Sequence, residues 1–330
     1  MIPLRKTILL AAVLLCVTQL CKSQDMQIEK TMDGHIAFWL KWDSAQDRFI
    51  AYRSVDDASI PSARLYDRDG HIRPIYPLRD LAESRNFNIW DAAATPEGGM
   101  VLAGLIGYGP PQDHAQIKSV LLTYGPAGDL RKFWDVLPYE YDLVAVDGHG
   151  NVYALGNADL EEPYFMLVKY SPDGKVVRQF LSTSLFPVGH HILSPGGGTE
   201  GLNRMFIAGN VLFVWFARTQ ELLRFSLSGD LFSRVSLAHS LSQLAAANGS
   251  DGISLHSLAA GEGDQIIAGV VIWDTQSTKT PPKSLLVQLS PDGSSATPLQ
   301  VNLDKSQFLG RSSTGKLILL EPSSGLVKTY

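Results

Sequence analysis

Cysteine is almost absent from this sequence. Only two of the 330 residues are cysteines, Cys16 and Cys21, and both lie in an apolar N-terminal segment that we expect to be removed. The remaining chain could form no disulfide, so its stability must come from a large buried core. Concentrated charge is also missing, because the net charge of −5 is spread along the chain. This argues against a nucleic-acid surface or a polybasic membrane patch.

Catalytic signatures are missing too. The sequence has no phosphate-binding Walker loop, no Gly-x-Ser-x-Gly nucleophile elbow and no His-Glu-x-x-His zinc motif. We therefore predict no catalytic residue from sequence motifs.

The N-terminal segment has the pattern of an export signal. Arg5 and Lys6 precede an unbroken apolar run over residues 8–15, and small residues stand at the −3 and −1 positions of a cleavage site before Gln24. The apolar run is short for a membrane span. We predict a signal peptide over residues 1–23, one domain over residues 24–330, and a secreted or periplasmic location. An uncleaved membrane anchor is the alternative.

One unit recurs along the chain: an apolar strand, a turn of the Asp/Ser-x-x-Gly type and a second strand. In such turns Pro presets φ at the second position, Asp or Ser bonds to the local backbone, and Gly takes a positive φ. The unit occurs at residues 65–70, 123–128, 169–174, 224–229, 288–293 and, in degenerate form, 320–325. We assign all six turns to one class.

A second class of hairpin turn alternates with the first. It occurs at residues 43–47, 94–99, 147–151, 208–210, 261–264 and 312–315. The strands that follow are nearly all apolar, as expected of strands covered on both faces. Six turns of each class predict an all-β, six-bladed β-propeller with four-stranded antiparallel blades. A β-sandwich array is the alternative fold, and it fits the four-strand repeat less well.

The last unit has strands near residues 307–311, 316–320 and 326–330, and it lacks a fourth. Residues 26–31 supply a spare strand ahead of the first blade. We therefore predict that this N-terminal strand pairs with residues 326–330 and closes the ring, which leaves no blade edge exposed. A truncated last blade is the alternative.

The Tyr-Ser-Pro-Asp-Gly sequence at residues 170–174 and the Leu-Ser-Pro-Asp-Gly sequence at residues 289–293 carry a family resemblance. With the strand pattern around them, they resemble the secreted six-bladed propellers of the NHL, TolB-like and gluconolactonase-like type. The resemblance extends over nearly the whole chain after the signal. It implies a fold only, since these turns recur in propellers of unrelated activity.

Segment length indicates which face to search. The turns between first and second strands, and between third and fourth, are short and share one face of a propeller. The long segments are residues 76–86, 105–116, 181–201, 237–252 and 273–282. All five are expected on the opposite face, and long segments in a compact domain are usually functional or disordered. The best helix candidate, residues 237–247, lies in one of them.

Candidate binding residues gather near the mouth of the central channel on that face. The set predicted from the inner strands and the long segment between the third and fourth blades is His35, Asp91, Asp142, His190, His191, Arg204 and His256. The resemblance implies that such a ring holds calcium in lactonase-like propellers and zinc in lyase-like ones. Here the signs are mixed and carboxylates are few, which disfavours calcium. We predict no metal ligand and no cofactor.

Two functions fit these observations. The first is an exported, non-catalytic propeller that binds a protein, peptide or glycan on its long-loop face. The alternative is a metal-dependent hydrolase or lyase with its site at the channel mouth. We favour binding over catalysis because no catalytic constellation is found. We also expect a monomer that binds no nucleic acid and, after signal cleavage, no membrane.

Overall fold

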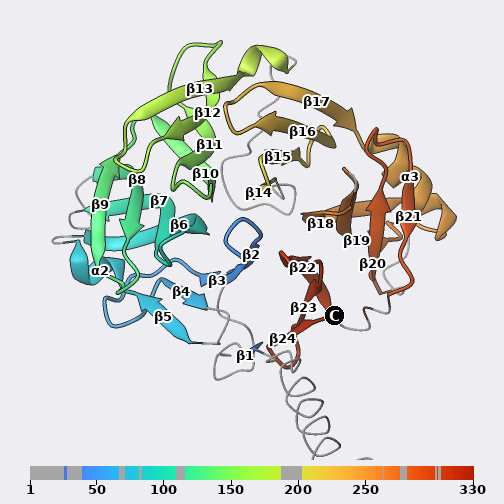
Figure 1. Ribbon diagram of the computed structural model, residues 1–330, viewed down its shortest axis with the longest axis horizontal. Helices are drawn as coiled ribbons and strands as arrows, with labels where there is room; N and C mark the ends of the chain where they lie inside the picture. Colours follow the sequence, from blue (N-terminus) through green and yellow to red (C-terminus); the bar gives the residue numbers. More distant parts are fainter. Residues whose placement is uncertain are drawn as a thin grey trace, which may run out of the picture.

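The computed structural model describes residues 26–27, 39–66, 71–81, 84–108, 116–186, 203–262, 264–275, 281–301, 303 and 306–330. These residues form six four-stranded sheets arranged in a ring, which is a six-bladed β-propeller (Figure 1). Strands pair antiparallel within every blade, as the sequence predicts. The predicted signal peptide, residues 1–23, lies outside the described residues.

The strands of each blade run from the channel outward. Blade 1 contains β2 (Trp39–Asp43), β3 (Arg48–Tyr52), β4 (Ala63–Tyr66) and β5 (Ile72–Ile75). Blade 2 contains β6 (Ser84–Ala94), β7 (Met100–Tyr108), β8 (Gln116–Tyr124) and β9 (Leu130–Asp135). Blade 3 contains β10 (Tyr139–Val146), β11 (Val152–Ala158), β12 (Phe165–Tyr170) and β13 (Val176–Ser182).

The second half of the ring repeats the same order. Blade 4 contains β14 (Arg204–Ala208), β15 (Val211–Phe216), β16 (Glu221–Ser226) and β17 (Leu231–Ser236). Blade 5 contains β18 (Gly252–Ala260), β19 (Ile266–Trp273), β20 (Lys283–Leu289) and β21 (Ala296–Pro298). Blade 6 contains β22 (Gln307–Arg311), β23 (Leu317–Glu321), β24 (Leu326–Thr329) and β1 (Met26–Gln27).

Among the described residues, helical structure is confined to connections between blades. The helix predicted over residues 237–247 is confirmed as α3 (Ala238–Ala247), between blades 4 and 5. A four-residue helix, α2 (Pro77–Asp80), joins blades 1 and 2, and η1 (Thr183–Leu185) follows blade 3. Pro77 at the first turn suits α2, because proline needs no backbone N–H partner there.

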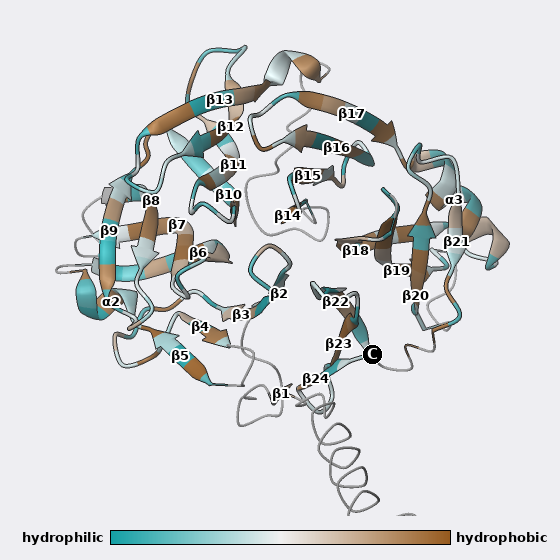
Figure 2. Ribbon diagram, viewed as in Figure 1, coloured by the Kyte–Doolittle hydropathy of each residue, from teal (hydrophilic) through white to brown (hydrophobic). Residues whose placement is uncertain are grey.

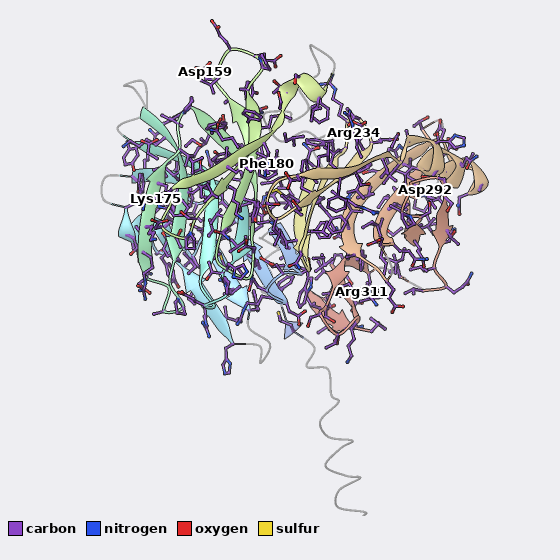
Figure 3. All side chains as sticks on the ribbon, turned by 45° about the horizontal axis from the view of Figure 1, so that its top comes forward. Asp159, Lys175, Phe180, Arg234, Asp292 and Arg311 are labelled. Atoms are coloured by element: carbon purple, nitrogen blue, oxygen red, sulfur yellow. The ribbon has the colours of Figure 1, made fainter. Side chains whose placement is uncertain are left out.

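The predicted turn chemistry is confirmed in the turns that the structure describes, while residues 67–70 of the first predicted turn lie outside the described residues. In the turn between β12 and β13, Gly174 has a φ of 88° and its N–H donates to the carbonyl of Ser171 at 2.9 Å. Figure 3 places Lys175 and Asp292, from two such turns, on opposite sides of the ring. The degenerate turn near Gly325 differs in position, because it joins β23 to β24, the second and third strands of blade 6. Its glycine shares the positive φ of the class, at 75°, and this common requirement groups it with the other turns in the sequence.

The core lies between neighbouring blades. Six clusters of buried hydrophobic residues are found among the described residues, one for each of the six interfaces between blades. Figure 2 shows hydrophobic residues recurring along the strands of the blades. This explains the nearly continuous apolar strands, since β7 and β15 are covered by a blade on each side.

Ring closure follows the prediction. Met26 pairs with Val327 and Gln27 with Leu326, so β1 completes blade 6 from the other end of the chain. Met26 also packs against the hydrophobic cluster between blades 6 and 1, which contains Phe49 and Val327. The paired stretch is shorter than predicted, because residues 28–31 lie outside the described part of the chain.

The two faces of the ring differ in their connections. We call one the loop face; it carries the turns between second and third strands and the connections between blades. The opposite side, the turn face, carries the turns between first and second and between third and fourth strands. All five long segments connect strands on the loop face, as predicted, although the strands extend into several of them. Parts of four segments lie outside the described residues.

The blade 1 turn between β2 and β3 reaches across the turn-face end of the channel (Figure 1). Ser44 Oγ donates to the Ile207 carbonyl of blade 4 at 3.1 Å, and Gln46 Nε2 donates to the Val146 carbonyl of blade 3 at 3.3 Å. Asp47 accepts bonds from the N–H and hydroxyl of Ser313 in blade 6, at 2.9 and 2.8 Å. One turn therefore ties blade 1 to three other blades.

Candidate functional site

Four predicted binding residues lie on inner strands of consecutive blades. Asp91 is on β6, Asp142 on β10, Arg204 on β14 and His256 on β18. The other three, His35, His190 and His191, lie outside the described residues. The four described side chains are close enough for their charges to shift one another's protonation: Asp91 acts on Asp142 and Arg204, and Arg204 acts on His256.

Bulges determine where these side chains stand. The inner strands of blades 2, 3 and 5 each carry an extra residue at the same position: Trp90, Asp142 and His256. Arg85 in blade 2 and Leu309 in blade 6 are further extra residues at other positions. Each of the three stands four positions before the last paired residue of its strand (residues 94, 146 and 260). A bulge bends its strand and redirects a side chain, and bulges are common beside active sites.

Counting four positions back from the last paired residue of the inner strand gives one residue in every blade. We call this set the mouth ring; its members are Trp39, Trp90, Asp142, Arg204, His256 and Gln307. Trp39 is 70% exposed, and Gln307 is also exposed. The remaining four are partly buried. The ring thus combines two indoles with an acid, a guanidinium, an imidazole and an amide.

Sequence reasoning missed Trp39, Trp90 and Gln307, although a signal for the bulges was present. Gly104, Gly156 and Gly269 interrupt the second strands of blades 2, 3 and 5 and pair beside Trp90, Asp142 and His256. A Cβ on Gly156 would lie 1.9 Å from the carbonyl oxygen of Glu140, and one on Gly104 would lie 2.1 Å from that of Asn88. Isolated glycines inside strand patterns indicate such close approaches.

Asp91 has a full set of partners. It is 2% exposed, and its Oδ2 accepts bonds from Lys41 Nζ at 2.6 Å and from the Val144 N–H at 2.9 Å. Tyr52 donates its hydroxyl to Oδ1 at 3.3 Å. These contacts join blades 1, 2 and 3 around one carboxylate. They assign Asp91 a structural role, and its predicted part in ligand binding stays a prediction.

Asp142 differs from Asp91 in having no hydrogen-bond partner among the described residues. Burial raises the pKa of its carboxyl to about 7, and the negative charges of Glu140 and Asp91 add to the effect. A carboxyl without a partner, beside a channel and with a raised pKa, is typical of functional sites. Near neutral pH it can donate a proton in a hydrogen bond or accept one.

Arg204 and His256 form a connected pair. Arg204 Nε donates to the His256 carbonyl at 2.8 Å, and Nη1 donates to the Asn203 carbonyl at 2.8 Å. Burial lowers the pKa of Arg204, while Tyr52 and Asp91 favour its charged form. Burial, and then the charge of Arg204, lower the pKa of His256. The imidazole is therefore biased toward its neutral form, and Arg204 supplies the positive charge of this part of the ring.

A side pocket of about 290 Å³ lies between blades 5 and 6 and includes two mouth-ring residues, His256 and Gln307. Pro322, from the loop-face turn of blade 6, is also part of its wall. Its apolar wall is formed by Val270, Val271, Leu285, Leu303 and Phe308. Ser257 also lines it, and the buried Ser257 hydroxyl has no hydrogen-bond partner among the described residues. An apolar pocket with a few polar groups is the usual form of a site for a small group.

The residues at the mouth do not fit a divalent metal ion. Within the described ranges, no group of three His, Cys, Asp or Glu residues is placed to hold one. Asp91 is already bonded to Lys41, and the cationic Arg204 lies in the same cluster. A calcium site needs six or more oxygen ligands, and a catalytic zinc site usually has three protein ligands.

Comparisons with known proteins extend the fold assignment. No protein-family model matches the chain, and no curated protein matches it in sequence. A member of the DUF4221 family from Bacteroides vulgatus is similar in structure, with a TM-score of 0.53, 8% identity, and coverage of 93% of this chain and 95% of that one. This likeness confirms the fold of the six-bladed propellers that the sequence resembles.

Two further structures are similar at lower scores. A candidate exported protein from Bacteroides fragilis has a TM-score of 0.49 and 8% identity, and the match covers 90% of this chain and 83% of that one. A gluconolactonase from Xanthomonas campestris has a TM-score of 0.43 and 9% identity, with 94% and 96% covered. Separately, none of the helices in the described ranges has the length and apolarity to span a membrane.

Proposed function

We propose that this chain is an exported, non-catalytic binding protein that recognises a peptide segment of a partner protein at the channel mouth on its loop face. The observation that carries the proposal is the mouth ring, which presents six side chains of five kinds at one level of the inner strands. Indole, guanidinium and amide groups together are typical of protein recognition surfaces, where Trp and Arg often dominate the binding energy.

The side pocket favours a peptide over a glycan. Half of its twelve lining residues are apolar, and Val270, Leu303 and Phe308 lie buried around it. An apolar side chain of a peptide would displace water from such a wall favourably, whereas a sugar would have to bury hydroxyl groups there. Beside the pocket, Gln307 and Arg204 offer hydrogen bonds to a peptide backbone or its carboxylate.

Export is part of the proposal and rests on the pattern of residues 1–23. Cleavage before Gln24 would release the propeller with β1 only two residues from its new N-terminus. N-terminal sequencing of the exported protein should therefore begin near Gln24. Recovery of an intact Met1 terminus from that fraction would contradict cleavage.

The binding experiment uses the chain from residue 24 onward, a displayed library of random peptides and a glycan array. We expect enrichment of peptides that contain an apolar anchor residue. Trp39→Ala should weaken the binding of the best peptide by about tenfold, because exposed tryptophans at interfaces commonly contribute more than 1 kcal/mol to the binding free energy. Gln307→Ala should reduce the affinity for this peptide by a smaller factor.

Phe232→Ala is the matched control. Phe232 is 58% exposed on β17, the outermost strand of blade 4, away from the inner strands. Its removal should leave binding unchanged. Selection of glycans without peptides, or equal effects of Trp39→Ala and Phe232→Ala, would refute the proposed site.

The second candidate function is a hydrolase or lyase at the same mouth. Only the raised pKa of Asp142 favours it, since a carboxyl that titrates near pH 7 suits general acid or base catalysis. Its metal-dependent form has no support in the donor set around Asp142. Turnover of a bound peptide that disappears in Asp142→Asn while binding persists would favour this candidate.

A further inference from the structure

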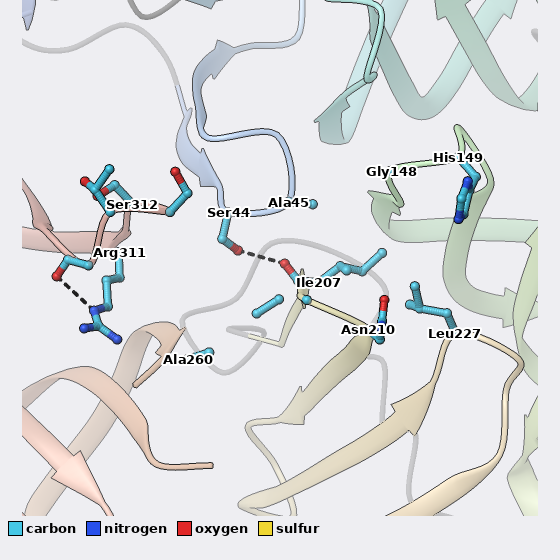
Figure 4. A pocket seen from close by; sticks show the side chains of 15 residues that line it. Ser44, Ala45, Gly148, His149, Ile207, Asn210, Leu227, Ala260, Arg311 and Ser312 are labelled. Atoms are coloured by element: carbon cyan, nitrogen blue, oxygen red, sulfur yellow. Dashed lines mark hydrogen bonds between the residues drawn. The ribbon is translucent and has the colours of Figure 1, made fainter. Parts of the chain in front are cut away.

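A second cavity lies on the turn face, where no binding residue is expected from the sequence. Its volume is about 670 Å³, and its walls come from the turns between first and second strands in blades 1, 3, 4 and 6 (Figure 4). Ser44 and Ala45, from the blade 1 turn that crosses the channel, form one side. The cavity and the mouth ring therefore belong to opposite faces.

The lining of this cavity has a distinctive composition. None of its fifteen residues is an aspartate or glutamate, and none is Phe, Tyr or Trp. Arg311 and His149 lie on opposite sides of it, with Ser44 and Asn210 between them (Figure 4). Further hydroxyls come from the blade 6 turn at residues 312–314. Hydrogen-bonding groups without a carboxylate suit an anion with hydroxyl groups, and the lack of a flat apolar ring does not suit a stacked base.

Arg311 is available to such a ligand at small cost. Its Nε donates to the Gly315 carbonyl at 2.9 Å, which fixes the guanidinium against its own turn. Its Nη2 forms an ion pair with Glu262 Oε1 at 3.2 Å, but the Glu262 side chain is 88% exposed. Exposed ion pairs contribute little free energy, so a bound anion could replace this carboxylate.

Two carboxylates near the cavity already have hydrogen-bond partners in the protein. Asp47 accepts the Ser313 N–H and hydroxyl. Asp147 accepts the N–H groups of His149 and Asn151, both at 2.9 Å, and the Tyr153 hydroxyl at 3.1 Å. These bonds hold the lining turns in place, and preorganised groups lose less entropy when a ligand binds.

A second cation, Lys169, lies close to the cavity without lining it. Lys169 Nζ donates to the carbonyl of Leu227 at 2.9 Å, and Leu227 lines the cavity. Lys169 and Arg311 thus place positive charge on two sides of the cavity. Among the fifteen lining residues themselves, Arg311 is the one with a permanent charge, so the lining favours an anion.

We propose that the turn-face cavity binds a monosaccharide that carries an anionic group, either a phosphate or a carboxylate. Arg311 would pair with the anionic group, as guanidinium groups commonly do. The hydroxyls of Ser44 and residues 312–314, with the amide of Asn210, would bond to the sugar hydroxyls. This site is independent of the peptide site proposed for the loop face.

Isothermal titration calorimetry with four probes tests the proposal. We expect glucose 6-phosphate or glucuronate to bind, and glucose to bind at least about tenfold more weakly, because a hydrogen bond to a charged group contributes about 1.5–3 kcal/mol. Affinity should fall as salt concentration rises. Equal binding of glucose would overturn the role of the anion. Equal binding of inorganic phosphate would overturn the role of the sugar, and absence of binding by all four would overturn the site.

Three variants locate the site. Arg311→Gln should weaken binding of the anionic sugar about tenfold, because it also removes the hydrogen bond to a charged group. Glu262→Gln should tighten binding of the anionic sugar by about two- to threefold, because this substitution removes the carboxylate that competes for Arg311. Lys175→Gln, which removes an exposed cation at the ring's periphery, is the control and should change nothing (Figure 3).

Each variant is also checked for an unchanged melting temperature. Trp39→Ala should bind the sugar normally, so failure of the peptide proposal would leave this result untouched. Similar losses in Arg311→Gln and Lys175→Gln would mean general charge attraction and would overturn the site.

Discussion

The buried carboxylates near the ring axis have different roles, and the number of hydrogen bonds that each one accepts distinguishes these roles. Asp43 accepts the Ala94 N–H at 2.8 Å as well as two N–H groups of its own turn, while Asp91 is bonded to Lys41. Asp142 lies on the same set of inner strands without a partner among the described residues. A buried carboxylate that is fully bonded stabilises the fold, whereas one without partners costs free energy and persists where function needs it.

The cost of Asp142 predicts a pH-dependent stability. Its folded pKa of about 7 lies above its ordinary value of 3.8, so the folded chain keeps a proton that the unfolded chain releases. Asp142 therefore weakens the fold progressively as pH rises through this interval. Asp142→Asn should raise the free energy of unfolding near pH 8. The pKa shift sets an upper limit of about 4 kcal/mol, and the actual gain should be smaller because the side chain is partly exposed. Near pH 4 the two proteins should be almost equal.

Urea denaturation at several pH values measures this difference. Glu97→Gln, in an exposed turn of blade 2, is the matched control and should show no such pH dependence. A constant difference between Asp142→Asn and the parent protein across the whole pH range would show that the carboxyl titrates normally.

At the scale of strands and turns, the sequence was informative where local chemistry determines structure. The Ser-Pro-Asp-Gly turns and the apolar strands between them identify hairpins, since proline, aspartate and glycine act through their nearest neighbours. The same property explains why the turn near Gly325 falls in the same class. Gly325 has a φ of 75°, like glycines of the other turns, although its N–H donates to a carbonyl four residues back, that of Glu321, at 2.8 Å. Strand position within a blade depends on long-range pairing, which local chemistry does not encode.

The candidate site was harder to predict, for a related reason. Asp91 and Asp142 are both acidic residues in inner strands, and sequence gives no indication that only Asp91 meets Lys41 from another blade. Nor does alternation predict Trp90 in the mouth ring, because a bulge breaks the two-residue period there. The turn-face cavity is formed by turns from blades far apart in sequence. Such a cavity becomes visible only once the ring is assembled.

Over the whole molecule, stability depends on six similar interfaces, and the one between blades 6 and 1 joins the two ends of the propeller. Each blade packs on both neighbours, so an opened ring would expose two apolar blade faces and an unpaired strand edge. Of the part of the N-terminal end that the structure describes, β1 is the strand that belongs to blade 6. The pairing of the short strand β1 with β24 therefore determines whether the ring is closed.

Removing β1 should consequently weaken the entire domain. A chain that begins at residue 28 is expected to melt several degrees below one that begins at residue 24, in a single transition, because Val327 loses the strand paired beside it. Conversely, Met26→Cys with Val327→Cys places two cysteines directly opposite each other, in a chain with no other thiol after residue 23. Their disulfide should form readily and stabilise the fold by up to about 5 kcal/mol in the chain-entropy account.

The control pair Met26→Cys with Thr329→Cys has the same composition and a mismatched register, since Thr329 pairs with Ile318 on the other side of β24. It should form the disulfide slowly and incompletely. Non-reducing electrophoresis and calorimetry under oxidising and reducing conditions measure both effects. If the two pairs oxidise equally well and the shortened chain melts unchanged, β1 does not close the ring, and blade 6 must hold with three strands.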